Sequence, residues 1–130
     1  MPRSEDRAGS PDDWLSHARS DLALAEISPP ENVMLEGLCF HAQQAVEKAI
    51  KALLISYNLE FPRTHNIGAL LDLLPDTVLV PSEVEESVSL TAYAVMTRYP
   101  GDTEPVDTDE YIEAIRLANA VLKWVQQLLQ

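Results

Sequence analysis

Residues 38–54, LCFHAQQAVEKAIKALL, form the stretch around which this chain is organised. The stretch has neither Gly nor Pro and is rich in Ala, Leu, Gln, Glu and Lys, which lose little rotamer freedom in a helix. Apolar residues recur at three- and four-residue steps and so share one helix face. They are Leu38, Ala42, Ala45, Ala49 and Leu53, with Cys39, Val46 and Ile50 beside them. Small alanines would let a neighbouring helix approach closely, so we predict the central helix of a bundle.

A polar edge runs along the same predicted helix. It consists of His41, Gln44, Lys48 and Lys51. With Arg63 and His65 in the following loop, this edge could form a small positive patch that binds an anion or a nucleotide phosphate. The alternative is a solvated helix face on which Glu47 supports Lys51 at four-residue spacing.

Cap residues and prolines predict where the first two helices begin and end. The sequence SPDD, residues 10–13, is typical of a helix start, with Ser as the N-cap and Pro at the first helical position. This helix should end before the prolines at 29 and 30. A second helix is expected to begin at Asn32 and to run through the central stretch to about Tyr57.

Shorter elements are expected in the middle of the chain. Asn66 can cap a short helix over residues 67–74. The sequence SEVE, residues 82–85, matches a capping box at the start of a helix that runs to about Thr97. The segment TVLV, residues 77–80, is expected to be a buried connection because no other segment offers it a partner strand.

The last predicted helix begins after Asp107, which with Glu110 is typical of a helix start. This helix, from about Thr108 to Leu129, has two apolar stripes. One consists of Tyr111, Ile115, Ala118, Leu122, Val125 and Leu129. The other consists of Leu117, Val121, Trp124 and Leu128. A surface helix of a monomer needs only one such stripe, so we predict that the second forms a homodimer interface. The alternative is that the first helix covers it within one subunit, through Trp14 and Leu22.

The length of 130 residues predicts one helical domain, residues 11–130, and the polar composition of the N-terminus predicts a flexible tail, residues 1–10. The expected fold class is all-α, an antiparallel up-and-down bundle of four to five helices. The 130 residues include 21 acids and 9 bases, a net charge of −12, so a nucleic-acid role requires a local basic patch or a basic partner. Cys39 is expected to be a buried thiol, which fits a cytoplasmic location. No apolar run is long enough to span a membrane.

Three motifs resemble the HEPN domain family (higher eukaryotes and prokaryotes nucleotide-binding). They are FHAQQAVEKAIKALL at residues 40–54, FPRTHNIGALL at residues 61–71 and RYPG at residues 98–101. The resemblance extends from about Trp14 to Leu129. It implies an all-α, usually dimeric domain, often encoded beside a minimal nucleotidyltransferase and acting in toxin–antitoxin or related defence systems. Many members are metal-independent RNases that use an Arg, four to six residues, then a His.

This chain departs from that RNase pattern. Arg98 is followed by YPGDTEP, which contains no histidine, and His65 lies only two residues after Arg63. Arg19 has no histidine in range either. The catalytic pair implied by the resemblance therefore matches no position here, and catalytic residues stay unassigned.

Several residues are candidates for binding a ligand or nucleotide. They are His41, Gln44, Lys48, Lys51, Arg63, His65, Arg98 and Tyr99. A histidine at a helix start, such as His65, can instead lock the loop by donating to a backbone carbonyl. Arg98 is also typical of a helix end. The three histidines have no metal-ligand spacing with one another or with Cys39, so we predict no metal and no cofactor.

Three functions stay open at this point. The first is a dimeric binding and assembly module that pairs with a nucleotidyltransferase. The second is an RNase toxin with an atypical site, in which folding brings Arg98 to His65 or His41. The third is a nucleotide-binding sensor that uses Lys48, Lys51 and Arg63.

Overall fold

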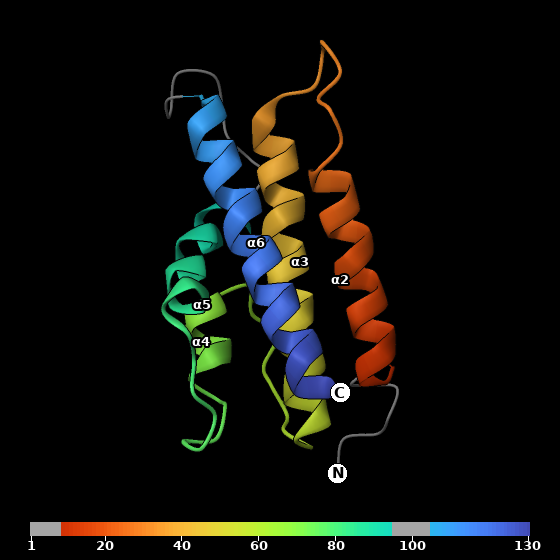
Figure 1. Ribbon diagram of the computed structural model, residues 1–130, viewed down its shortest axis with the longest axis vertical. Coiled ribbons are helices and arrows are strands. Elements are labelled where there is room, and N and C mark those ends of the chain that lie inside the picture. Colours follow the sequence, from red (N-terminus) through yellow and green to blue (C-terminus); the bar gives the residue numbers. More distant parts are fainter. Residues whose placement is uncertain (1–8, 95–104) are drawn as a thin grey trace.

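The described part of the chain is a bundle of three long helices and one segment built from short helices (Figure 1). The computed structural model describes residues 9–94 and 105–130. Its elements are α2 (Pro11–Ala25), α3 (Leu35–Ser56), α4 (Ile67–Leu71), α5 (Ser82–Glu86), the 3₁₀ helix η1 (Ser87–Ala94) and α6 (Thr108–Leu129). α2 and α3 run in opposite directions, α6 runs in the same direction as α3, and the short helices α4, α5 and η1 together form a segment that we call the third leg. The described residues contain helices and no strands, which confirms the predicted all-α up-and-down bundle. Residues 1–8 of the predicted tail lie outside the described ranges.

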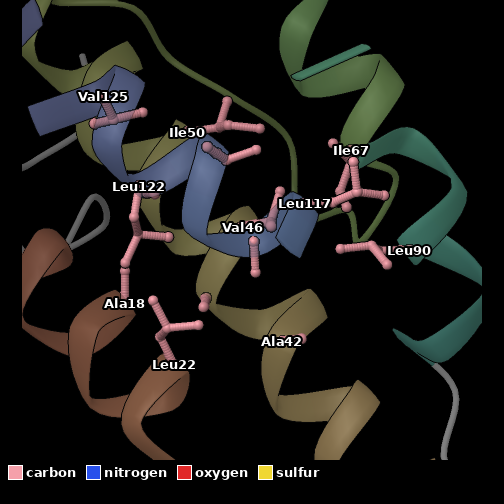
Figure 2. Close-up of a cluster of buried hydrophobic side chains, with 14 of the residues drawn as sticks. Ala18, Leu22, Ala42, Val46, Ile50, Ile67, Leu90, Leu117, Leu122 and Val125 are labelled. Carbon is pink, nitrogen blue, oxygen red and sulfur yellow. The ribbon is translucent and has the colours of Figure 1, made fainter. Parts of the chain in front are cut away.

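The predicted central helix is α3, which packs against α2, α4, η1 and α6. Every residue predicted for its apolar face, with the three residues beside it, is at most 4% exposed. Figure 2 shows Val46 and Ile50 of α3 in the same core as Leu122 and Val125 of α6. Cys39 is buried, as predicted. Burying one such aliphatic side chain stabilises the fold by about 1.5–3 kcal/mol, so this face accounts for much of the bundle's stability.

Cap residues begin three helices where the sequence predicts. Ser10 Oγ accepts from the Asp13 N–H at 3.1 Å, and Asp13 Oδ2 accepts from the Ser10 N–H at 3.0 Å, which forms a capping box. Asp107 Oδ1 accepts from the Glu110 N–H at 2.7 Å at the start of α6. Asn66 caps α4. These bonds satisfy backbone donors that the first turn of a helix leaves without partners.

Two boundaries differ from the prediction. α3 begins at Leu35 rather than at Asn32, because the chain first forms a turn in which the Val33 N–H donates to the Pro30 carbonyl at 2.9 Å. α4 ends at Leu71, and turns replace the last three residues of the predicted helix.

The predicted capping box of Ser82 and Glu85 is wrong. Pro81 occupies the N-cap position of α5, and its carbonyl accepts from the N–H groups of Val84 and Glu85 at 3.0 and 3.1 Å. Ser82 therefore already lies inside the helix. The chain then changes to 3₁₀ at Ser87, whose hydroxyl donates to the Val84 carbonyl at 2.5 Å. Serine hydroxyls compete in this way for helix carbonyls.

The connection over residues 77–80 is not a strand, but the prediction that it is buried is wrong. Leu79 is 86% exposed, while Val78 and Val80 are partly buried. A turn closed by the Val78 N–H and the Pro75 carbonyl at 2.9 Å leaves Leu79 outside the core. The predicted helix end near Thr97 lies outside the described residues. None of the described helices is long and apolar enough to cross a membrane.

The prediction that the second stripe of α6 forms a dimer interface is wrong, because the first half of this stripe is buried inside the subunit. Leu117 and Val121 are 2% and 0% exposed. Trp124 is partly buried against the core, and only Leu128, at 43%, is largely exposed. Changing Val121 would therefore disrupt the core and would not test an interface.

One core covers both stripes because α6 lies across α3, with α2 on one side and the third leg on the other (Figure 1). In Figure 2, Leu122 of the first stripe points toward Ala18 and Leu22 of α2, whereas Leu117 of the second stripe lies on the side of Leu90. The alternative, in which α2 covers the second stripe, is therefore also wrong. α2 covers the first stripe.

Candidate functional site

Two buried acids organise the polar edge of α3. They are Asp21 of α2 and Glu47 of α3, which are 8% and 3% exposed. An ionised carboxylate away from water is stable only when cations and hydrogen-bond donors surround it. Both acids have such partners, and most of these partners belong to the predicted polar edge.

The first cluster joins α2 to α3. Lys48 Nζ donates to Asp21 Oδ2 at 2.6 Å, and His41 Nδ1 lies 3.0 Å from Asp21 Oδ1. His41 and Lys48 are two turns apart on one face of α3, so a single carboxylate facing that face can reach both. Asp21 follows Ala18 by three residues and thus lies on the apolar side of α2, which is the signal that could have revealed it.

The second cluster joins α3 to the loop before α4. Lys51 Nζ donates to Glu47 Oε2 at 2.7 Å, Gln43 Nε2 donates to Glu47 Oε1 at 3.0 Å, and His65 Nδ1 lies 2.8 Å from the same Oε1. Gln43 Nε2 also donates to the His65 carbonyl at 3.3 Å. Gln44 Nε2 donates to Gln43 Oε1 at 2.7 Å. The buried amide of Gln43 therefore has partners for its oxygen and its nitrogen.

The environment lowers the pKa of Glu47 below the ordinary value of a glutamate. Burial alone would raise this pKa, but hydrogen bonds to Lys51, His65 and Gln43 and the charge of Lys51 together outweigh burial. Glu47 is therefore ionised in the folded protein at neutral pH and remains a counter-charge for Lys51.

Lys51 also lies beside two aromatic rings that contact each other. Its Nζ is 5.6 Å from the centroid of the Trp14 ring and 5.4 Å from that of Phe61. The two rings meet edge to face at 82°, with their centroids 6.2 Å apart. A desolvated cation–π contact contributes up to about 2 kcal/mol. α2, α3 and the following loop thus converge on one ammonium group.

The prediction of a positive patch on the surface is therefore wrong. Lys48 and Lys51 are each neutralised by a buried carboxylate. The alternative of a solvated face is also wrong because Lys51 is 8% exposed, although Glu47 and Lys51 do pair at the predicted four-residue spacing. Arg63 is exposed and forms no ion pair within residues 9–94 and 105–130.

His65 combines an exposed ring with a fixed orientation. Its side chain is 64% exposed, yet Glu47 holds Nδ1. The expected donation to a backbone carbonyl is thus replaced by a bond to a carboxylate. A carboxylate that engages one ring nitrogen leaves the other for proton transfer. Arg98 and Tyr99 lie outside the described residues. Within the described ranges, no group of three His, Cys, Asp or Glu side chains could hold a metal ion.

The fold and this polar edge define an all-helical bundle whose central helix is tied to its neighbours by buried ion pairs. The HEPN domain family model matches residues 11–128, and the chain belongs to the HEPN domain family.

Two solved structures are similar to this chain over nearly its whole length. One is the crystal structure of TT1696 from Thermus thermophilus, with a TM-score of 0.78 and 34% identity over 90% of this chain and 96% of that chain. The other is ST0689, an archaeal HEPN homologue, with a TM-score of 0.72 and 26% identity over 94% of this chain and 99% of that chain. A search of the curated proteins found no match.

Proposed function

We propose that this chain is a dimeric binding and assembly module that pairs with a minimal nucleotidyltransferase in a toxin–antitoxin or related system. The observation that carries the proposal is the internal use of the charges on α3. Lys48 and Lys51 neutralise Asp21 and Glu47, so this edge holds the bundle together. Membership of the HEPN family supports the assembly role, since the family resemblance implies dimers and such partners.

The overall charge supports a protein partner over RNA. A net charge of −12 opposes the approach of phosphate backbones, whereas it favours a basic protein surface. The neutralised lysines also weaken the case for a nucleotide sensor at the α3 edge. Titration calorimetry with ATP distinguishes that function, because a sensor would bind ATP and lose binding in Arg63→Ala.

An exposed apolar surface near the start of α6 suits the dimer contact. Ile112 is 58% exposed. Together with Tyr111, Ile115 and Glu26 it lines a groove of about 190 Å³ between α6 and the end of α2. Ile112 is a large aliphatic side chain exposed beside a groove, which favours contact with another protein surface. We therefore assign the homodimer to this surface, in place of the second stripe of α6.

Ile112→Glu should convert the dimer into a folded monomer. The change places a charge in the proposed contact and should weaken association by about 30-fold, the effect of losing a residue worth about 2 kcal/mol. Light scattering across a dilution series measures it. Gln127→Glu is the matched control, because it adds the same charge at another exposed position of α6. A wild-type monomer at all concentrations, or an unchanged dimer in Ile112→Glu, would refute this assignment.

The partner is tested separately by identifying the protein encoded beside this chain and co-expressing the two. We expect the two proteins to co-purify at a fixed ratio. A neighbouring gene of another kind, or a nucleotidyltransferase that elutes alone, would remove the partner from the proposal and leave the dimer unaffected.

One observation favours a second function, an atypical RNase. His65 is exposed and oriented by the buried Glu47, the arrangement by which a carboxylate prepares a histidine for proton transfer. The further catalytic residue would be Arg98.

Purified protein should not cleave RNA in the presence of a chelator. The reasons are the missing Arg-to-His spacing and the charge of −12, which opposes RNA binding. Incubation of labelled RNA with the wild type, His65→Ala and Arg98→Ala measures it. Cleavage by the wild type that disappears in both variants would establish the enzyme and overturn this prediction. Equal cleavage by all three would instead identify a contaminant.

A further inference from the structure

Within the part of the chain that the structure describes, two cations without an ion pair meet in one groove. This part contains six Lys and Arg residues, and three of them are paired with acids. The paired cations are Lys48, Lys51 and Arg116. Of the others, Arg19 of α2 and Lys123 of α6 line the same groove of about 200 Å³ between these helices. This convergence is notable because the whole chain carries 21 acids against 9 bases.

We infer that the groove between α2 and α6 binds a small dianion of the phosphate class, either inorganic phosphate or a phosphomonoester. Two cations match a doubly charged ligand, with the guanidinium of Arg19 as a charged hydrogen-bond donor and the ammonium of Lys123 as a point charge. A phosphomonoester is largely dianionic at neutral pH because its second pKa is about 6. A groove of about 200 Å³ has room for a phosphate and a small organic group, since one water takes about 30 Å³.

Gln126 positions the guanidinium. With the amide oxygen of Gln126 directed toward α2, this oxygen accepts from Arg19 Nε at 2.9 Å and from Arg19 Nη2 at 3.2 Å. The two bonds fix the plane of the guanidinium at the groove and leave Nη1 for a ligand. A cation that is already ordered loses less entropy when a ligand binds.

The acid that lines the groove, Glu26, lies at its opposite end. Asn119 Nδ2 donates to Glu26 Oε2 at 3.0 Å, so Glu26 faces Asn119 as Arg19 faces Gln126 across the antiparallel helices. Glu26 is seven residues from Arg19, or about 10 Å along α2. At physiological salt this exceeds the screening length of about 8 Å, so Glu26 opposes an anion beside Arg19 only weakly. Along α6, Lys123 lies between Asn119, which faces Glu26, and Gln126, which faces Arg19.

The floor of the groove is apolar. Leu22 and Leu122 are 8% and 3% exposed and line the groove, and Figure 2 shows Leu122 pointing toward Leu22. An apolar floor lowers the local dielectric and strengthens the attraction between the two cations and an anion. The site uses none of the residues of the two α3 clusters and shares only Glu26 with the groove proposed for the dimer contact, so variants of Arg19 and Lys123 test it separately from the proposed function.

Titration calorimetry at about 0.15 M salt tests the site with inorganic phosphate, glycerol phosphate and acetate. Arg19→Gln and Lys123→Gln should each weaken phosphate binding about tenfold, the usual effect of losing one charged hydrogen bond. Arg116→Gln is the matched control. It removes the same charge from α6 at a position paired with Glu83 and Glu113, and affinity should change by less than about twofold. The side-chain amide signals of Asn119 and Gln126 should shift on saturation in NMR spectra.

The preferred ligand identifies the source of the phosphate. Tighter binding of glycerol phosphate points to a monoester, and tighter binding of inorganic phosphate points to the free ion. The inference is overturned by the absence of saturable binding at about 10 mM phosphate, a concentration that reveals even weak sites. An equal loss in Arg116→Gln or equal binding of acetate would also overturn it.

Discussion

Ala49→Asp should lower the free energy of unfolding by about 4 kcal/mol or more and the Tm by about 15 °C. Ala49 is fully buried on the α3 face that α6 and α2 cover. An aspartate there would be an unpaired carboxylate in an apolar core, and a neutral one would still lack space. Because small domains have only about 5–15 kcal/mol of stability, this loss removes a large share of it.

Thermal unfolding followed by circular dichroism measures this effect. Ala23→Asp is the matched control, because Ala23 is exposed in the interior of α2 and should cost about 1 kcal/mol or less through helix propensity. Ala45→Asp should behave like Ala49→Asp, since Ala45 is also fully buried. A wild-type melting curve for Ala49→Asp would contradict the place of α3 at the centre of the core.

Glu47→Ala should cost about 3–5 kcal/mol, because it leaves the ammonium of Lys51 buried without its counter-charge. His65 Nδ1 and Gln43 Nε2 would also lose their acceptor on Glu47. Most of this loss of stability should come from the unpaired charge of Lys51, because an unpaired buried charge costs far more than a missing hydrogen bond.

A second substitution separates these contributions. Adding Lys51→Met to Glu47→Ala should restore most of the lost stability, since a thioether packs well against the rings of Trp14 and Phe61. Urea unfolding of the wild type, both single variants and the double variant completes the cycle. Additive effects would show that Glu47 and Lys51 are not coupled. As a control, Glu113→Ala breaks an exposed pair and should leave the Tm almost unchanged.

The contribution of Glu47 to the free energy of unfolding should be lost at acid pH. The folded pKa of Glu47 is lowered, so the folded state binds its proton less readily than the unfolded chain does. The stability that the ionised Glu47 contributes is fully present above its unfolded-state pKa of about 4.3, and it is lost as pH falls through its pKa in the folded state. Glu47→Gln should therefore show a shallower loss of stability below about pH 4.3 than the wild type.

Local sequence patterns predict most of the fold. The spacing of Ala42, Ala45 and Ala49 places one face of α3 against its neighbours, and the caps at Ser10 and Asp107 lie beside the helices they begin. Each of these signals involves residues within about one or two turns. Such interactions depend little on the rest of the chain, which explains why the sequence alone is enough to predict them.

The site required contacts that local patterns do not contain. Asp21 and Lys48 are 27 residues apart, and Glu47 and His65 are 18 apart, so only the packed bundle brings their charges together. The burial of Leu117 could not be predicted from local patterns either, because residues of the third leg bury it. Helical periodicity showed that two sides of α6 are apolar, but it did not show that both are covered inside one subunit.

The third leg is assembled from two five-residue α-helices and eight residues of 3₁₀ helix. Helices shorter than about 12 residues do not persist in water unaided, because nucleating each one costs more than its few hydrogen bonds return. This leg therefore keeps its shape only through α3 and α6, whereas those long helices are supported along their whole length. Local unfolding should begin here, and a partner could remodel this side of the bundle without disturbing the centre.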